Sequence, residues 1–167
     1  MVAAMKIYEM SATMTGTDKT ASTVRFKLAD NATIDSNNPI TIPTGAMGAK
    51  RSFHKKLRMY CATAPSTSID NLQMYSDGSS GFGTGVTVNA SNRGVTWAAN
   101  ATTALTGGKD LFGFTSGAPM NIDAVDAAAI TTTGYGGDIV GLQMAVATTA
   151  GPGVLTDEVI TFSYDEI

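Results

Sequence analysis

The stretch from residue 50 to residue 78 constrains the fold most, because two runs of residues in it alternate between apolar and polar side chains. In the first run the apolar side holds Phe53, Leu57, Met59 and Cys61, and the polar side holds His54, Lys56, Arg58 and Tyr60. Lys55 is the exception on the apolar side. After a break at Ala64-Pro65-Ser66, Leu72 and Met74 repeat the pattern up to a turn at Ser76-Asp77-Gly78. A period of two is typical of half-buried strands, so the stretch predicts two β-strands joined by a short Pro/Ser link.

Similar patterns predict further strands at residues 22–29, 40–43, 86–88, 111–115, 138–148 and 158–165, with additional candidates at residues 5–10 and 94–97, whereas residues 11–22 should form a loop. In residues 22–29 the inward side holds Val24, Phe26 and Leu28, and the outward side holds Thr23, Arg25 and Lys27. The prolines around residues 40–43 place that piece at a sheet edge or a strand start. Residues 138–148 are apolar on both faces, which predicts a central strand. A turn at Gly151-Pro152-Gly153 follows, so the chain should end in a hairpin-like pair of strands that pins the C-terminus into the sheet.

The whole pattern indicates an all-β fold. About eight to nine strands separated by turns, with at most one short helix, predict a β-sandwich or a jelly roll. A chain of 167 residues should form a single domain over residues 1–167. Residues 100–136 are expected to be a long loop or insertion that contacts a partner. Within it, residues 121–130 fit either a short helix or a partly ordered excursion.

Charge is distributed unevenly along the chain. Residues 1–60 hold nine of the eleven Lys/Arg and four of the fourteen Asp/Glu, a balance of +5, whereas the remaining residues carry -8. The folded protein would then have a basic and an acidic pole, which favours head-to-tail or partner contacts over non-specific nucleic-acid binding. Alternatively, strands from both parts interleave and the charges mix, as β-sandwich topologies allow.

Few residues suggest catalysis or cofactor binding. Cys61 is the only cysteine and shares the phase of the apolar side, which indicates a buried, inert thiol. His54 is the only histidine and has lysines beside it, so we expect a solvated or interface histidine without a catalytic or metal-binding role. Asp30, Asp35, Asn37 and Asn38 crowd one loop, where they form Asx turns or offer oxygen ligands to calcium. We therefore expect no enzyme activity and no cofactor.

Phosphate and membrane sites are not indicated either. The glycines of residues 78–85 lack a following helix and a Gly-Lys-Ser/Thr motif, so this run predicts a flexible loop and not a phosphate cradle. The first ten residues lack the features of a signal peptide, and no apolar run reaches the roughly 18 residues of a membrane span. We expect no membrane association.

The cations of residues 50–58 are the strongest electrostatic feature, and they form either a solvated face that protects a sheet edge, a protein contact or a phosphate-binding surface. Apart from Phe53 on the apolar side, the cluster contains no interleaved aromatic residues, which argues against nucleic acid. The residues expected to contact a partner are Lys50, Arg51, His54, Lys56 and Arg58. Trp97, the only tryptophan, would either stack on a sugar or belong to the core.

Residues 22–78 resemble small structural proteins of tailed bacteriophages. The resemblance lies in Asp30-Asn31, Asn38-Pro39-Ile40, Ile42-Pro43, Ser52-Phe53-x-Lys55, and Ile69-x-Asn71-Leu72 leading to Tyr75-Ser76-Asp77-Gly78. This order is similar to head decoration, or cement, proteins. The resemblance implies a β-sandwich or jelly-roll domain that sits as a homotrimer on the capsid and clamps neighbouring major capsid protein subunits. It brings no catalytic residues with it.

Two functions are consistent with these patterns. The first is a protein made in the host cytoplasm and carried on the virion, which stabilises an icosahedral capsid because it binds only the assembled state. A cyclic trimer would provide three equivalent contacts at a three-fold site. The alternative is a carbohydrate-binding module or tail-associated adhesin, with Trp97, Tyr135 or Tyr164 as stacking platforms.

Overall fold

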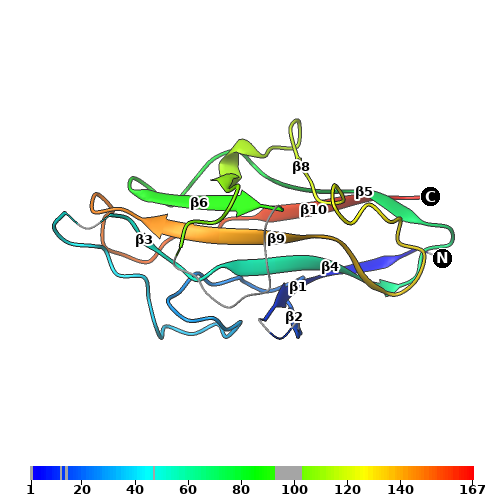
Figure 1. The fold of residues 1–167 in the computed structure, drawn as a ribbon, viewed down its shortest axis with the longest axis horizontal. Coiled ribbons are helices and arrows are strands. Elements are labelled where there is room, and N and C mark those ends of the chain that lie inside the picture. The colour runs from blue at the N-terminus through cyan, green and yellow to red at the C-terminus, as the bar shows by residue number, and fades with distance from the viewer. Residues whose placement is uncertain (1, 12, 14, 47, 93–102) are drawn as a thin grey trace.

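The protein folds into two antiparallel β-sheets that pack face to face (Figure 1), so the predicted all-β sandwich is confirmed. The computed structural model describes residues 2–11, 13, 15–46, 48–92 and 103–167. The larger sheet has seven strands: β1 (Ala4–Met10), β2 (Gly16–Asp18), β3 (Lys50–Arg51), β4 (Lys55–Thr63), β6 (Val86–Ser91), β7 (Lys109–Asp110) and β9 (Gly134–Val146). The smaller sheet has three: β5 (Ile69–Ser76), β8 (Met120–Asn121) and β10 (Ile160–Glu166). A single 3-10 turn, η1 (Leu111–Gly113), is the helix of the described chain.

Strand β9 is the centre of the larger sheet, as the sequence predicts. The strand order is β2-β1-β4-β9-β6-β7, and β3 also pairs with β9. Figure 1 shows β9 running between β4 and β6 along most of the molecule. Leu142 lies opposite Lys55 of β4 and also opposite Ala90 of β6. With partners on both edges, β9 is buried along nearly all of its length.

The core fills the space between the two sheets. The larger sheet contributes alternate residues, including Leu57, Met59 and Cys61 of β4 and Val140, Leu142 and Met144 of β9. The smaller sheet contributes Ile69, Leu72 and Met74. Ile69 and Leu72 are three residues apart and still face the same side, because Asn71 adopts a left-handed conformation with φ 50° within a β-bulge. The alternation is therefore confirmed for Leu57, Met59 and Cys61 and for Leu72 and Met74, although β4 and β5 belong to different sheets. It is wrong at the start of the first run, because Phe53 lies before β4 and is only partly buried, and Lys56 is buried.

The predicted strand at residues 22–29 is wrong, because this segment has no strand hydrogen bonding. Its backbone instead makes single bonds to irregular neighbours, with Leu28 N donating to Asn38 O and Phe53 N donating to Lys27 O. Val24 and Phe26 do pack against the core as expected. Lys27, expected on the outside, is only 1% exposed.

Other local predictions also need correction. Residues 40–43 form no strand, residues 111–115 begin with the η1 turn, and residues 121–130 contain no helix after β8 ends. The loop prediction for residues 11–22 missed the short strand β2. The last two long strands do not form a hairpin, since β9 belongs to the larger sheet and β10 pairs with β5. The strand predicted at residues 94–97 lies outside the described residues.

The termini and the charges can also be placed. Ser68 and Ile167 exchange two backbone hydrogen bonds, so the C-terminus is pinned into the smaller sheet as expected. The strand order keeps β2, β1 and β4 on one side of β9 and β6 and β7 on the other, so the two parts of the chain do not alternate across the larger sheet. Four cations of the basic part are nevertheless buried, namely Lys19, Lys27, Lys55 and Lys56. The surface is therefore less basic at that side than the sequence suggests.

Candidate functional site

Three tyrosines and an arginine gather on the outer face of the larger sheet, where they form a tyrosine patch (Tyr8, Tyr60, Tyr135 and Arg58). They come from the neighbouring strands β1, β4 and β9, whose register sets Tyr60 opposite Tyr135 and Tyr8 opposite Arg58. The ring centroids lie 5.2 Å apart for Tyr8 and Tyr60, 5.0 Å for Tyr60 and Tyr135, and 5.8 Å for Tyr8 and Tyr135. The tilted and edge-on packing is the arrangement that aromatic rings prefer.

The alternation of β4 produces this patch. Met59 and Cys61 face the core, so Arg58 and Tyr60 must face outward. Gly16 of the edge strand β2 leaves room for the rings, because a Cβ atom there would lie 2.5 Å from Tyr135 Oη and 2.6 Å from Tyr8 Cδ1. The patch therefore depends on four strands of one sheet.

Arg58 is fixed in place by the strand beside it and by one loop. Its Nε donates to Gly137 O at 3.0 Å, and its Nη2 donates to Asp126 Oδ2 at 2.6 Å. Its guanidinium carbon lies 5.9 Å from the Tyr135 ring centroid, within cation–π range. Tyr135 is 39% exposed, and its partial burial raises the pKa of the phenol, so the hydroxyl stays neutral. The patch thus offers fixed rings, phenol hydroxyls and one cation at the surface.

Asp138 holds the loop that carries Asp126. The Asp138 carboxylate accepts hydrogen bonds from the backbone N–H groups of Ala124, Val125 and Asp126, at 2.8 to 3.3 Å, and from Asn92 Nδ2 at 2.9 Å. Asp138 is only 5% exposed, so the loop is anchored from within the protein. After β8 ends at Asn121, residues 122–130 are consequently an ordered loop without helical structure.

The five residues expected to contact a partner do not form one surface. Lys50 and Arg51 border a groove of about 570 Å³, whose other lining residues are Leu28, Thr41, Ile42, Pro43, Thr44, Gly48 and Ala49. Lys50 Nζ donates to Thr41 Oγ1 at 2.6 Å. Arg58 belongs to the tyrosine patch, near the other end of β9. Lys50 pairs with Val146, and Tyr60 pairs with Tyr135, so the two sites lie about 35 Å apart along the strand.

His54 and Lys56 lie between these two sites, where Lys56 is buried and His54 is half-buried. His54 Nε2 lies 3.1 Å from Thr103 O, and burial lowers the pKa of its ring. Lys56 is only 4% exposed, and burial lowers the pKa of its ammonium group. The expectation that Lys56 presents its charge to solvent is therefore wrong, and the loop that contains Thr103 explains the partial cover of His54.

Buried lysines form a second cluster that the sequence pattern indicated only through Lys55. The ammonium groups of Lys55, Lys19 and Lys27 donate to the carbonyl oxygens of Asn31, Ala32 and Thr33 at 2.7, 2.8 and 2.9 Å, in that order. Lys55 also pairs with Glu9 at 2.8 Å, and Lys27 pairs with Asp35 at 3.3 Å. These three lysines therefore hold residues 31–33 in place next to the sheet, which is a structural role.

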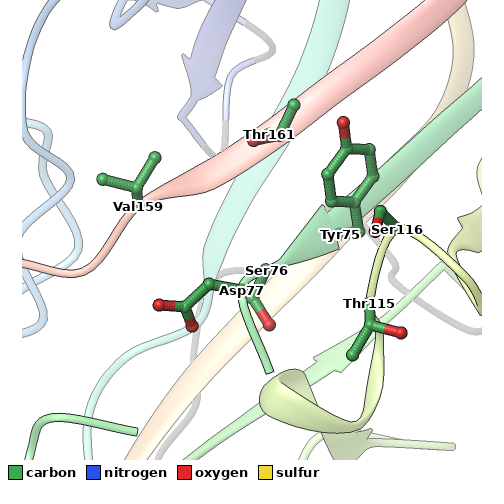
Figure 2. A pocket seen from close by; sticks show the side chains of 7 residues that line it. All are labelled: Tyr75, Ser76, Asp77, Thr115, Ser116, Val159 and Thr161. Atoms are coloured by element: carbon green, nitrogen blue, oxygen red, sulfur yellow. The ribbon is translucent and has the colours of Figure 1, made fainter. Parts of the chain in front are cut away.

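A small hollow lies on the smaller sheet (Figure 2). It has a volume of about 200 Å³ and is lined by Tyr75, Ser76, Asp77, Thr115, Ser116, Val159 and Thr161. The sequence pattern marked Ser76, Asp77 and Gly78 only as a turn. The residues that complete the hollow come from distant parts of the chain, so no local signal could have found it.

Cys61 is fully buried, as predicted, and burial raises the pKa of its thiol. Asp35 is engaged by Lys27, and the described residues contain no cluster of three or more His, Cys, Asp or Glu side chains suited to a metal ion. Tyr164 packs partly buried against the core, and Trp97 lies outside the described residues. No helix in the described ranges is long and apolar enough to cross a membrane.

Comparison with known proteins yields no match to this chain among protein families, curated proteins or solved structures.

Proposed function

We propose that the protein is a structural component of a tailed-phage virion that decorates the capsid and stabilises it by bridging major capsid protein subunits. The tyrosine patch is the observation that carries this proposal. Tyrosine and arginine are, with tryptophan, enriched among the side chains that dominate protein–protein binding energy. Here three tyrosines and Arg58 share one face of a sheet.

The geometry of the patch favours a protein partner over a small molecule. The rings lie on the face of a sheet. They line neither the groove beside Lys50 and Arg51 nor the small hollow on the smaller sheet. Arg58 is already held by Gly137 and Asp126, so little side-chain freedom is lost when a partner binds. A rigid aromatic surface of this kind suits a contact with another folded protein.

Stabilisation would follow from mass action. A protein that binds the assembled capsid and not its separate subunits shifts the equilibrium towards the assembled state. A homotrimer fits this function, because a three-fold arrangement presents the same patch three times to equivalent capsid subunits. The resemblance of residues 22–78 to decoration proteins points in the same direction.

Thermal melting of the cognate capsid tests the proposal. We expect the capsid to melt at a higher temperature with the wild-type protein than without it. The double variant Tyr60→Ala/Tyr135→Ala should bind about 700-fold more weakly, since each central tyrosine contributes about 2 kcal/mol and the two together about 4 kcal/mol. Tyr75→Ala, on the other sheet, is the matched control and should stabilise the capsid like the wild type. Equal melting with and without the protein would disprove the function, whereas full activity of the double variant would exclude the patch.

A further inference from the structure

The hollow of Figure 2 joins three segments that are distant in sequence. Tyr75 and Ser76 end strand β5, Thr115 and Ser116 follow the η1 turn, and Val159 and Thr161 lie at the start of β10. The lining side chains surround a shallow space of about 200 Å³. Pockets for drug-sized ligands usually measure about 300 to 1,000 Å³, so this hollow suits one small ring.

Hydrogen bonds within the protein hold the wall of the hollow in place. Ser76 donates its hydroxyl to Phe114 O at 3.0 Å, and its backbone N–H donates to the same oxygen at 2.8 Å. Ala118 N donates to Thr115 O at 3.0 Å and closes the following turn. These bonds fix residues 114–118 against the end of β5.

Four hydroxyl groups around the hollow are available for a ligand. Across the described residues, the side-chain hydroxyls of Tyr75, Thr115, Ser116 and Thr161 make no hydrogen bond to another protein group. Asp77 accepts a hydrogen bond from Ser79 N through Oδ1 at 2.9 Å, which leaves Oδ2 for a further donor. A hydroxyl both donates and accepts, and a carboxylate accepts strongly.

This lining indicates the chemistry of the ligand. The residues that surround the hollow include one carboxylate and no cation, which disfavours phosphate and other anions. Val159 is the one aliphatic side chain among them, so a purely apolar ligand would leave the hydroxyls unsatisfied. A sugar ring matches both features, because its hydroxyls pair with the polar groups and its C–H face packs on an aromatic ring such as Tyr75.

We propose that this hollow binds a single neutral saccharide ring, with Tyr75 as the stacking surface and Asp77 as the principal hydrogen-bond acceptor. This site is separate from the tyrosine patch, since β5 and β10 belong to the smaller sheet. The proposal therefore does not depend on the capsid function. It also differs from the platforms expected from the sequence, because Tyr164 packs against the core and Tyr135 belongs to the tyrosine patch.

Titration of the isotope-labelled full chain with glucose, galactose, mannose and N-acetylglucosamine, followed by amide NMR, tests the proposal. We expect at least one sugar to cause saturable shifts confined to residues 75–77, 115–116 and 159–161. Asp77→Asn keeps Oδ1 for Ser79 and so preserves the turn, yet it should weaken binding about tenfold through loss of the charged acceptor. Tyr75→Ala should weaken binding at least as much.

Tyr135→Ala serves as the control and should bind the sugar like the wild type. The absence of saturable shifts with all four sugars would overturn the proposal. Shifts that persist unchanged in both Asp77→Asn and Tyr75→Ala, or that disappear in Tyr135→Ala, would also overturn it. The amide spectrum of each variant shows directly that the fold is retained.

Discussion

Replacing Lys55 with methionine removes one half of a buried ion pair. Lys55 Nζ lies 2.8 Å from Glu9 Oε1, and the two residues are only 2% and 4% exposed. In the variant the Glu9 carboxylate keeps one cation, Lys19, whose Nζ lies 3.7 Å from Oε2. Within the described chain, Oε2 has no hydrogen-bond partner, so the remaining compensation is weak.

The expected loss can be worked out from this geometry. Removing one partner of a buried pair costs about 3 to 5 kcal/mol, and the remaining Lys19 places this variant near the lower limit. For a domain of this size about 3 kcal/mol corresponds to a fall in melting temperature of about 6 to 12 °C. The variant Glu9→Gln should also destabilise the protein. Because both changes disrupt the same pair, the double variant should lose about 2 kcal/mol less than the sum of the two.

Denaturant unfolding followed by circular dichroism measures these differences. Lys6→Met is a matched control, since Lys6 Nζ lies at the same 2.8 Å from Asp18 Oδ2 but both side chains are about 40% exposed (42% and 39%). Exposed ion pairs contribute little, so Lys6→Met should unfold close to the wild type. If Lys55→Met unfolds at the wild-type midpoint, or Lys6→Met loses as much, then burial does not determine the strength of this pair.

Three further predictions concern other positions. Gly137→Ala should lower the free energy of unfolding by about 1 to 3 kcal/mol in the same assay, because φ is +70° at this position and the new Cβ atom would lie 2.6 Å from Leu72 Cδ1. An unchanged free energy of unfolding would contradict this prediction. Burial lowers the pKa of His54, so the unfolded state binds more protons, and stability should fall as pH drops through about 6.5 towards the lowered value. NMR titration of this single imidazole checks the sign, and a pKa above 6.5 would refute it. Asp138→Asn should speed amide hydrogen exchange at residues 124–126 and leave β4 unchanged, whereas equal exchange would show that the carboxylate does not anchor the loop.

Alternation along the sequence predicted which side chains face the core better than it predicted hydrogen-bond partners. In residues 22–29, Val24 and Phe26 pack inward as expected, yet the backbone bonds to loops and forms no strand. Burying these side chains reduces the exposed apolar surface whether the backbone bonds to a strand or to a loop. Lys27 is buried because Thr33 O and Asp35 meet its ammonium group, and this requires a loop conformation that the pattern does not encode.

The candidate site was predictable only in part, for a similar reason. The outward position of Arg58 and Tyr60 follows from the phase of β4, and the sequence also suggests Tyr135 as a stacking residue. Their meeting with Tyr8 depends on the strand order β1-β4-β9 and on a register that includes β-bulges. Residues 111–113 show the same limit of prediction from alternation within one short segment. Leu111 and Phe112 are consecutive and both buried, which fits the η1 turn capped by Asp110 and not a strand.

The central position of β9 has a consequence for how the chain is synthesised. Its partners β4 and β6 end by residue 91, but β9 is complete only at residue 146. Ribosomes add about 5 to 20 residues per second, so about 3 to 11 s separate the ends of β6 and β9. During this interval the strand edges that β9 will cover are open to pairing with other nascent chains. The partly synthesised chain, more than the finished sandwich, is therefore the form most exposed to aggregation.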